Sequence, residues 1–292
     1  MSNPEGIARR CRLPNDDFDL AWTSIKLAGG VHERLLAQSL LSFTVRQKLS
    51  FEEAPLHGLI LLTGPPGTGK TTLGRGLANQ VARQFPGTKT TYVEVNAHAL
   101  ASAAHGRSQQ AVVKLFEQTI PELAMDGAAL VLLDEVETLA VSRHALSLEA
   151  NPVDVHRATD AALAGMDHLT RDHRNVLLIA TTNFPKALDQ AMLSRADHVE
   201  ELGLPGEEAR REIILETLKA VGGVWEKVRA LEDDAGRLAK AAEGLDGRRV
   251  RKEIFVAIGS DIETAKDPNK LTRNRIESAF RQALKMQKEM AR

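Results

Sequence analysis

The stretch "GLILLTGPPGTGKTT", residues 58–72, decides the fold. Its first part is an apolar run typical of a buried strand, and its second part fits the pattern G-x-x-x-x-G-K-[ST]. Glycines at 64, 67 and 69 permit a tight loop whose backbone N–H groups converge on phosphate oxygens. A glycine-rich turn that matches by chance is the alternative, but a strand before the loop and a helix after it favour phosphate binding.

The residues of this loop have separate predicted tasks. Lys70 reaches the β- and γ-phosphates of a nucleotide, and the hydroxyl of Thr71 is the expected ligand of Mg²⁺. We therefore expect ATP and Mg²⁺ as cofactors. The residues predicted to contact ATP are Gly64, Pro65, Pro66, Gly67, Thr68, Gly69, Lys70, Thr71 and Thr72.

Short apolar runs alternate with helical patterns through the first two thirds of the chain. Strands are predicted at 58–63, 91–95, 128–134, 176–182 and 198–202, and helices at 31–48, 70–85, 106–118, 153–169 and 186–194. The strands at 128 and 176 are apolar at consecutive positions, so both of their faces should be covered. This alternation predicts an α/β fold, with a parallel sheet flanked by helices.

The strand signals stop after residue 204, and the rest of the chain has helical patterns. In the last predicted helix, Ile276, Phe280, Ala283 and Leu284 share one face. We therefore predict an N-terminal tail (1–12), a large α/β domain (13–204) and a smaller, all-helical lid domain (205–292).

Composition narrows the class of protein. The formal net charge is -1 over 292 residues, so no global positive field attracts nucleic acid or an anionic membrane. The single cysteine, Cys11, forms neither an internal disulfide nor a thiolate metal site. No apolar run approaches the roughly 18 residues of a membrane-spanning helix. We expect a soluble, cytoplasmic protein.

Two polar residues follow the apolar strand "ALVLLD". Asp134 ends that strand, where a carboxylate holds Mg²⁺, and Glu135 comes next, where a carboxylate orients and deprotonates an attacking water. An acidic strand end that starts a loop is the alternative, which the upstream phosphate loop argues against. Glu137 is interpreted as a solvated neighbour.

Three further polar residues are candidates for sensing the γ-phosphate. Asn183 follows the strand "VLLIATT", where its amide can bind the γ-phosphate or the lytic water, although an Asn before "FP" also forms turns. Arg195 can stabilise transition-state charge, or form a surface ion pair. Arg248 opens a helix of the predicted lid, where it senses the γ-phosphate or belongs to a solvated basic face.

In this order, "GPPGTGKTT", "LVLLDEVE", "ATTN", "LSRAD" and "GLDGR" resemble the AAA+ ATPases. The stretches "DEVETLAVSR", "NPVDVHRATDAAL" and "SRADHVEEL" narrow the resemblance to the pachytene-checkpoint ATPases. That resemblance implies a homohexameric ring with ATP between subunits, in which Arg195 acts in trans. It also implies that the ring remodels a HORMA-domain partner, and that bacterial relatives switch off antiphage cyclic-oligonucleotide (CBASS) signalling.

The chain departs from that family at three places. Only about a dozen residues precede "LPNDDFDL", so we expect no separate adaptor-binding domain. Asp246 replaces a small hydroxyl residue before "GR", and can pair with Arg248 or Arg249. The predicted substrate-gripping pore loop lacks the family's aromatic residue, and His105 is its wedge or an ordinary loop histidine. The pore-loop residues are Ala104, His105, Gly106 and Arg107.

Other interpretations remain at this point. A second pore loop is predicted around Arg143 and His144, with an exposed, unstructured loop as the alternative. A clamp or helicase loader shares the same ATP chemistry but should carry a basic groove, and the balanced charge shows none. A nucleotide-gated scaffold binds ATP without hydrolysis, and Glu135, Asn183 and Arg195 argue against it. We therefore expect an ATP-driven remodeller of protein partners.

Overall fold

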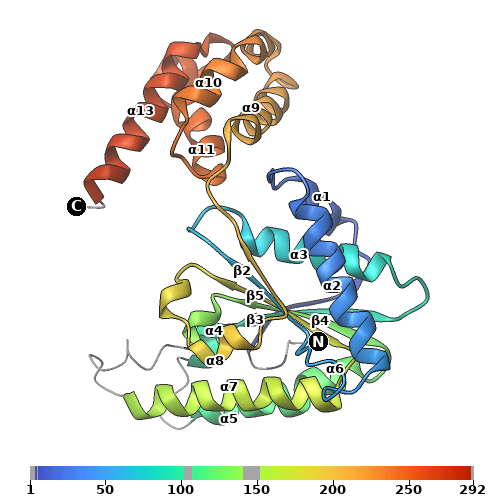
Figure 1. The fold of residues 1–292 in the computed structure, drawn as a ribbon. Coiled ribbons are helices and arrows are strands. Elements are labelled where there is room, and N and C mark those ends of the chain that lie inside the picture. Colours follow the sequence, from blue (N-terminus) through green and yellow to red (C-terminus); the bar gives the residue numbers. More distant parts are fainter. Residues whose placement is uncertain (1–3, 5, 102–106, 141–151, 291–292) are drawn as a thin grey trace. The chain divides into compact units, whose positions relative to one another are not determined.

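The computed structural model describes residues 4, 6–101, 107–140 and 152–290 (Figure 1). The chain forms two compact units. One comprises Met1–Ser24, His32–Gly64 and Lys70–Leu202, and the other comprises Ile25–Val31, Pro65–Gly69 and Gly203–Arg292. Within the described residues, none of the helices combines the length and the apolar content that crossing a lipid bilayer requires.

The first unit is built on a six-stranded sheet, in the order β1-β3-β4-β5-β2-β6. The edge strand β1 runs antiparallel to β3, whereas β3, β4, β5, β2 and β6 pair in parallel. The strands are β1 (Ile7–Leu13), β2 (Leu59–Thr63), β3 (Thr90–Asn96), β4 (Ala128–Asp134), β5 (Val176–Thr182) and β6 (His198–Glu201). The predicted α/β fold with a parallel sheet is therefore confirmed.

The two strands predicted from consecutive apolar residues occupy the predicted bounds. Every residue of β5 is buried, and β4 is buried except for the half-buried Asp134 at its end. Because parallel strands end at the same edge of a sheet, β2, β3, β4 and β5 bring their last polar residues together there. The register pairs Asn96 of β3 with Asp134 of β4. This edge carries the candidate site.

One prediction for the first unit is wrong. Residues 1–12 were expected to form a tail, but Ile7–Leu13 is a strand of the sheet. Ile7 and Leu13 are buried at its two ends, and the arginines between them are exposed or half-buried. Because three of the seven residues of "IARRCRL" are arginines, the stretch lacks the apolar alternation by which a strand is recognised.

Helices cover both faces of the sheet. On one face, a side chain at Gly74 of α3 would meet Leu132 and Ile179, so this glycine lets the helix approach the strands closely. The other face packs against residues of α5, α6, α7 and α8. The α-helices of this unit are α1 (Asp17–Thr23), α2 (Val31–Lys48), α3 (Lys70–Arg83), α4 (Ala97–Ala101), α5 (Arg107–Lys114), α6 (Ile120–Ala124), α7 (Pro152–Asp172) and α8 (Gln190–Ser194).

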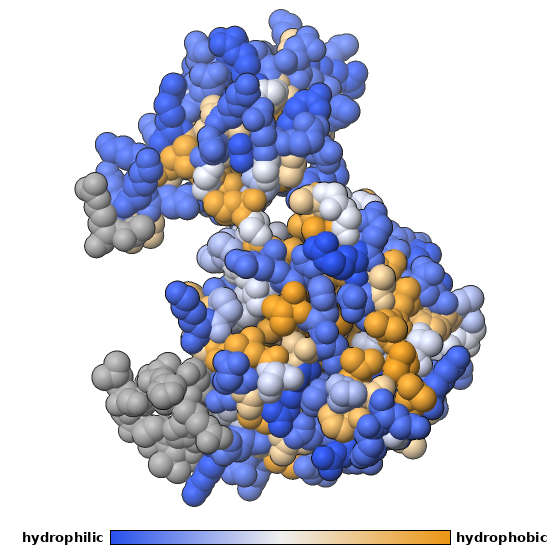
Figure 2. Space-filling view, in the orientation of Figure 1, coloured by the Kyte–Doolittle hydropathy of each residue, from blue (hydrophilic) through white to orange (hydrophobic). Residues whose placement is uncertain are grey.

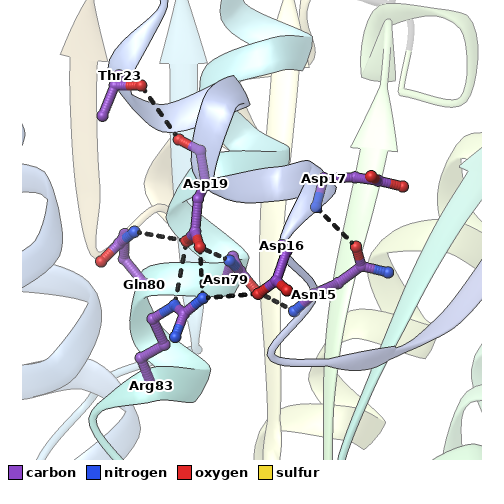
Figure 3. Close-up of polar contacts among 8 residues, drawn as sticks. All are labelled: Asn15, Asp16, Asp17, Asp19, Thr23, Asn79, Gln80 and Arg83. Carbon is purple, nitrogen blue, oxygen red and sulfur yellow. Dashed lines mark hydrogen bonds and ion pairs between the residues drawn. The ribbon is translucent and has the colours of Figure 1, made fainter.

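Helix α1 is fastened to α3 by a group of polar side chains (Figure 3). The Asn79 amide donates to Asp19 Oδ1 at 2.8 Å and accepts from the backbone N–H of Asn15 at 2.7 Å. Arg83 also pairs with Asp19. The two helices touch at Gly76, where an added Cβ would lie 2.6 Å from Trp22 Cα. These contacts fix α3, the helix that begins with Lys70.

The second unit contains the helical part of the chain after Leu204. Ile276, Phe280 and Ala283 are buried in its core, and Leu284 packs beside them, so the predicted apolar face is present. On the face shown in Figure 2, the surface of these helices is largely hydrophilic. The α-helices are α9 (Glu207–Gly222), α10 (Ala235–Ala241), α11 (Gly247–Ile258), α12 (Ile262–Lys266) and α13 (Arg273–Met290).

Candidate active site

The phosphate loop joins β2 to α3, as its sequence predicts. Gly64, Gly67 and Gly69 have φ values of 137°, 84° and 92°, which only glycine adopts without strain. Lys70 is the first residue of α3, and its buried ammonium donates to the carbonyl oxygen of Gly64 at 2.8 Å. The loop therefore presents positively charged and N–H groups at the start of a helix, which is an anion-binding arrangement.

The remaining residues predicted to contact ATP lie in the same loop or in the first turn of α3. Thr68 is buried, and its hydroxyl donates to the carbonyl oxygen of Pro65 at 2.9 Å. Pro65 and Pro66 are exposed, and Thr72 is half-buried. The two prolines have no N–H to offer a phosphate, so their contribution is to fix the backbone of the loop.

Asp134 and Thr71 lie beside each other. The Thr71 hydroxyl donates to Asp134 Oδ1 at 2.6 Å, and a second hydroxyl, from Thr181 of β5, donates to the same oxygen at 2.6 Å. A carboxylate and an alcohol are the oxygen ligands that Mg²⁺ prefers. Thr71 and Asp134 are the two residues that the sequence predicts as Mg²⁺ ligands, whereas Thr181 is not among the predicted site residues.

Glu135 has the left-handed conformation, with φ 53° and ψ 53°. Its backbone N–H donates to the Thr181 hydroxyl at 3.1 Å. Its carboxylate is held at both oxygens: Asn183 Nδ2 donates to Oε1 at 3.2 Å, and His98 Nε2 lies 2.7 Å from Oε2. Because an ionised carboxylate only accepts hydrogen bonds, the imidazole N–H is the donor. The structure thus brings Glu135 and Asn183 together.

Glu137 is not a solvated neighbour, and the interpretation from the sequence is wrong. It is half-buried, and its Oε1 accepts the backbone N–H of Asn183 at 3.1 Å. Its Oε2 is buried and has no hydrogen-bond partner among the described residues. Glu137 therefore supports the backbone of Asn183, a role that the sequence conceals because it depends on the turn after β4.

Arg195 lies just beyond α8, where its guanidinium makes two hydrogen bonds of 2.8 Å to Asp167 of α7. These bonds hold the pKa of Asp167 below its usual value and raise the pKa of Arg195. A third bond joins Arg195 to the carbonyl oxygen of Ala191. The structure therefore ties Arg195 to α7 and does not place it with Glu135 and Asn183.

Arg248 belongs to the second unit, where it is exposed on α11. The expected pairing of Asp246 with an arginine takes another form. Asp246 caps α11 by accepting the backbone N–H of Arg249 at 2.9 Å, and the Arg249 guanidinium pairs with Glu253 at 2.9 Å. Because Arg249 is engaged within its own helix, Arg248 is the better candidate for a sensor, and this assignment stays a prediction.

The pore-loop predictions fall mostly outside the described residues. Ala104, His105 and Gly106 lie there, and Arg107 is the first residue of α5. Arg143 and His144 also lie outside the described part of the chain. The pore-loop residues therefore stay predictions.

The sequence profile of the family described as "ATPase family associated with various cellular activities (AAA)" matches residues 60–204. CD-NTase-associated protein 6 of Pseudomonas aeruginosa is 47% identical over 285 residues, which cover 97% of this chain and 94% of that protein. The chain belongs to the AAA ATPases. A nucleotide at the phosphate loop is thus what the family implies.

Two further comparisons are with a pachytene checkpoint protein and with a solved chain of a HORMA complex. A protein of Caenorhabditis elegans named putative pachytene checkpoint protein 2 is 35% identical over 204 residues, covering 68% of this chain and 48% of that protein. The AAA ATPase thus matches about half the length of that relative. A solved chain of the E. coli MS115-1 HORMA:CdnC:Trip13 complex has the same fold, with a TM-score of 0.71 and 21% identity, over 94% of this chain and 95% of that one.

Proposed function

We propose that this AAA ATPase hydrolyses ATP to remodel a HORMA-domain partner, opening its closed complexes and thereby switching off antiphage cyclic-oligonucleotide (CBASS) signalling. Three similarities support the partner: the 47% identical relative is named for association with a CD-NTase, another relative is a checkpoint protein, and a chain of the same fold belongs to a HORMA complex. The observation that carries the chemistry is the position of Glu135, beside Asp134 and within 3.2 Å of the Asn183 amide.

The residues of the site fit a magnesium nucleotide. The three loop glycines adopt the positive φ that lets backbone N–H groups face phosphate oxygens, and Lys70 adds an ammonium. Thr71 and Asp134 are the residues that would hold the metal, and their oxygens already lie 2.6 Å apart. When bound, Mg²⁺ neutralises the negative charge of the phosphate oxygens.

Hydrolysis requires an activated water and stabilisation of the γ-phosphoryl group. Glu135 orients the water and takes its proton as the oxygen attacks the γ-phosphorus. The bond between that phosphorus and the bridging oxygen breaks, which gives ADP and phosphate. Asn183 holds the water or the γ-phosphate, and Lys70 stays on the phosphate oxygens. In this proposal, Arg248 of the lid senses the departure of the γ-phosphate.

The mechanical step requires more than one copy of the chain. The proposal includes a homohexameric ring in which Arg195 of one copy reaches the nucleotide of its neighbour. Loss of the γ-phosphate then releases the lid and moves the loops around residues 104–107 against the partner chain. It also includes a cytoplasmic location, because ATP, the proposed substrate, is available there.

The experiment uses a HORMA-domain protein closed around a fluorescent binding peptide. Wild-type protein with ATP and Mg²⁺ should release the peptide, and release should need hydrolysis. Glu135→Gln keeps the shape of the side chain but removes the base, so phosphate release should fall about 100-fold or more while nucleotide binding persists. Glu201→Gln, on the exposed face of β6, is the matched control. Peptide that stays bound during rapid hydrolysis would refute the remodelling, and full activity of Glu135→Gln would refute the chemistry.

A further inference from the structure

The hydroxyl of Thr181 touches both acidic residues of the candidate site. Thr181 is the penultimate residue of β5, and 1% of its surface is exposed. Its hydroxyl donates to Asp134 Oδ1 at 2.6 Å and accepts from the backbone N–H of Glu135 at 3.1 Å. A hydroxyl has one proton and two lone pairs. The proton of Thr181 is thus committed to the proposed metal ligand, and a lone pair to the proposed base.

The contact with Glu135 supports an unusual backbone. Among the described residues, Glu135 is the one residue other than glycine with a positive φ. A side chain in this conformation is strained, and it persists where the surroundings determine it. The left-handed turn sends the chain from β4 into a 3-10 turn at Val136–Thr138 and turns the Glu135 carboxylate toward Asn183 and His98. Thr181 is the acceptor that holds the N–H of this turn.

The hydrogen bond from Thr181 to Asp134 restrains the orientation of the Asp134 carboxylate. Oδ1 of Asp134 receives both the Thr181 and the Thr71 hydroxyls, so the rotation of its carboxylate is restrained from β5 and from α3. A metal ion held by Thr71 and Asp134 would replace the hydrogen bond between them, whereas the bond from Thr181 to Asp134 would remain. The Thr181 hydroxyl would therefore keep its hydrogen bonds to both Asp134 and Glu135.

We propose that Thr181 is a positioning residue for hydrolysis, which sets the orientation of Asp134 and Glu135 relative to each other through one hydroxyl. This proposal rests on the proposed function, because it assigns Asp134 to the metal and Glu135 to the water. A valine at 181 fills nearly the same volume but leaves the Glu135 N–H without its acceptor. Misplacement of the base slows the chemical step and leaves nucleotide binding by the phosphate loop intact.

The test compares Thr181→Val with Thr181→Ser in the full chain, by steady-state phosphate release, binding of a fluorescent ADP analogue and thermal melting. Thr181→Val should lower kcat about 10- to 100-fold. It should raise the Mg²⁺ concentration for half-maximal activity, and leave the affinity for the ADP analogue within about twofold of wild type. Thr181→Ser keeps the hydroxyl and should recover most of kcat. Thr217→Val, which removes a buried hydroxyl that donates to Ile213 in the second unit, should match wild type.

The outcomes separate this proposal from the proposed function. Wild-type kcat and Mg²⁺ dependence in Thr181→Val would overturn the positioning role alone. That role is also overturned if kcat, ADP affinity and melting temperature fall together, or if Thr181→Ser behaves like Thr181→Val, since each result indicates general damage to the fold. If wild-type protein releases no phosphate with or without a HORMA partner, the proposed function fails and this proposal fails with it.

Discussion

His98 Nε2 lies 2.7 Å from Glu135 Oε2, although the two residues are 37 positions apart in the chain. His98 is on α4, which follows β3, and Glu135 follows β4, so the parallel pairing of these two strands places them together. With Asn183 on the other oxygen, both oxygens of the Glu135 carboxylate have protein donors. Each oxygen keeps a second lone pair, so an attacking water shares the carboxylate with these donors or displaces one of them. The hydrogen bond from His98 is the weaker of the two, because 70% of the His98 side chain is exposed to solvent.

We predict that His98→Ala raises the phosphate-release rate measured without a partner. The expected rise is about two- to fivefold, the factor that an exposed pair contributes to an equilibrium. Since α4 directly precedes residues 102–106, stimulation by a partner bound there should shrink in the same variant. His98→Gln keeps an N–H donor and should stay near wild type. A large fall in the rate of His98→Ala would instead show that His98 aligns the base for attack.

Glu137 provides a second prediction. Glu137→Ala removes the acceptor of the Asn183 backbone N–H, so kcat should fall about tenfold as the amide loses its position. The free energy of unfolding should fall by about 1 kcal/mol, because the partly buried N–H of Asn183 loses its protein acceptor. Glu137→Gln retains a carbonyl acceptor at the same place. Equal losses in Glu137→Gln and Glu137→Ala would contradict the hydrogen-bond explanation, and chemical denaturation with steady-state kinetics measures both quantities.

Sequence patterns predicted the sheet well where burial is complete. The strands at 128–134 and 176–182 are found with the predicted bounds, because strands covered on both faces are apolar throughout. Helix α2 also has its predicted extent, but its buried face includes Ser39, Ser42 and Arg46. Arg46 donates to the carbonyl oxygen of Val176 at 2.6 Å, and burial lowers its pKa to about 10. The pattern of apolar residues in the sequence does not predict that an arginine is buried.

The candidate site shows the same limit. Thr71 was predicted from the phosphate-loop motif at the start of α3, and Asp134, Glu135 and Asn183 from motifs that place them at strand ends. Thr181 and His98 were missed, because their contacts depend on the order of the strands and on the left-handed turn at Glu135. Both follow from physics once that order is known, since neighbouring parallel strands bring their final residues side by side.

Arg195 and Asp167 give a third prediction. Arg195→Ala should lower the rate of the assembled protein about 1,000-fold if the guanidinium acts on a neighbour's nucleotide. Asp167→Asn keeps only one of the two acceptors that orient the Arg195 guanidinium, and should lower the rate about tenfold. Mixing Arg195→Ala protein with Lys70→Ala protein should restore part of the activity, because some sites then combine an intact loop with a neighbour's Arg195. Two inactive preparations that stay inactive when mixed would contradict action in trans.

A partly buried ion pair between α3 and β3 gives the last prediction, which concerns stability. Arg75 makes two hydrogen bonds to Glu94, at 2.9 and 2.7 Å, and Tyr92 donates to the same carboxylate at 2.9 Å. Burial alone would raise the pKa of Glu94, but the bonds from Arg75 and Tyr92 outweigh it and lower the pKa below the ordinary value of 4.5. An acid whose pKa is lowered by folding stabilises the protein above its unfolded pKa, and this stability is lost as the pH falls through the folded pKa.

Glu94→Gln should therefore destabilise the protein in a pH-dependent way. At pH 7 the free energy of unfolding should fall by about 1.5–3 kcal/mol, because the substitution leaves the Arg75 charge without its partner. As the pH falls from 4.5 through the lowered pKa of the folded state, the wild-type carboxylate becomes protonated, so the difference between the two proteins should shrink. Urea unfolding at pH 7 and in acid measures this difference in the free energy of unfolding, with Glu201→Gln on the exposed face of β6 as the control. A difference that stays constant across that range would show that Glu94 acts through packing and not through its charge.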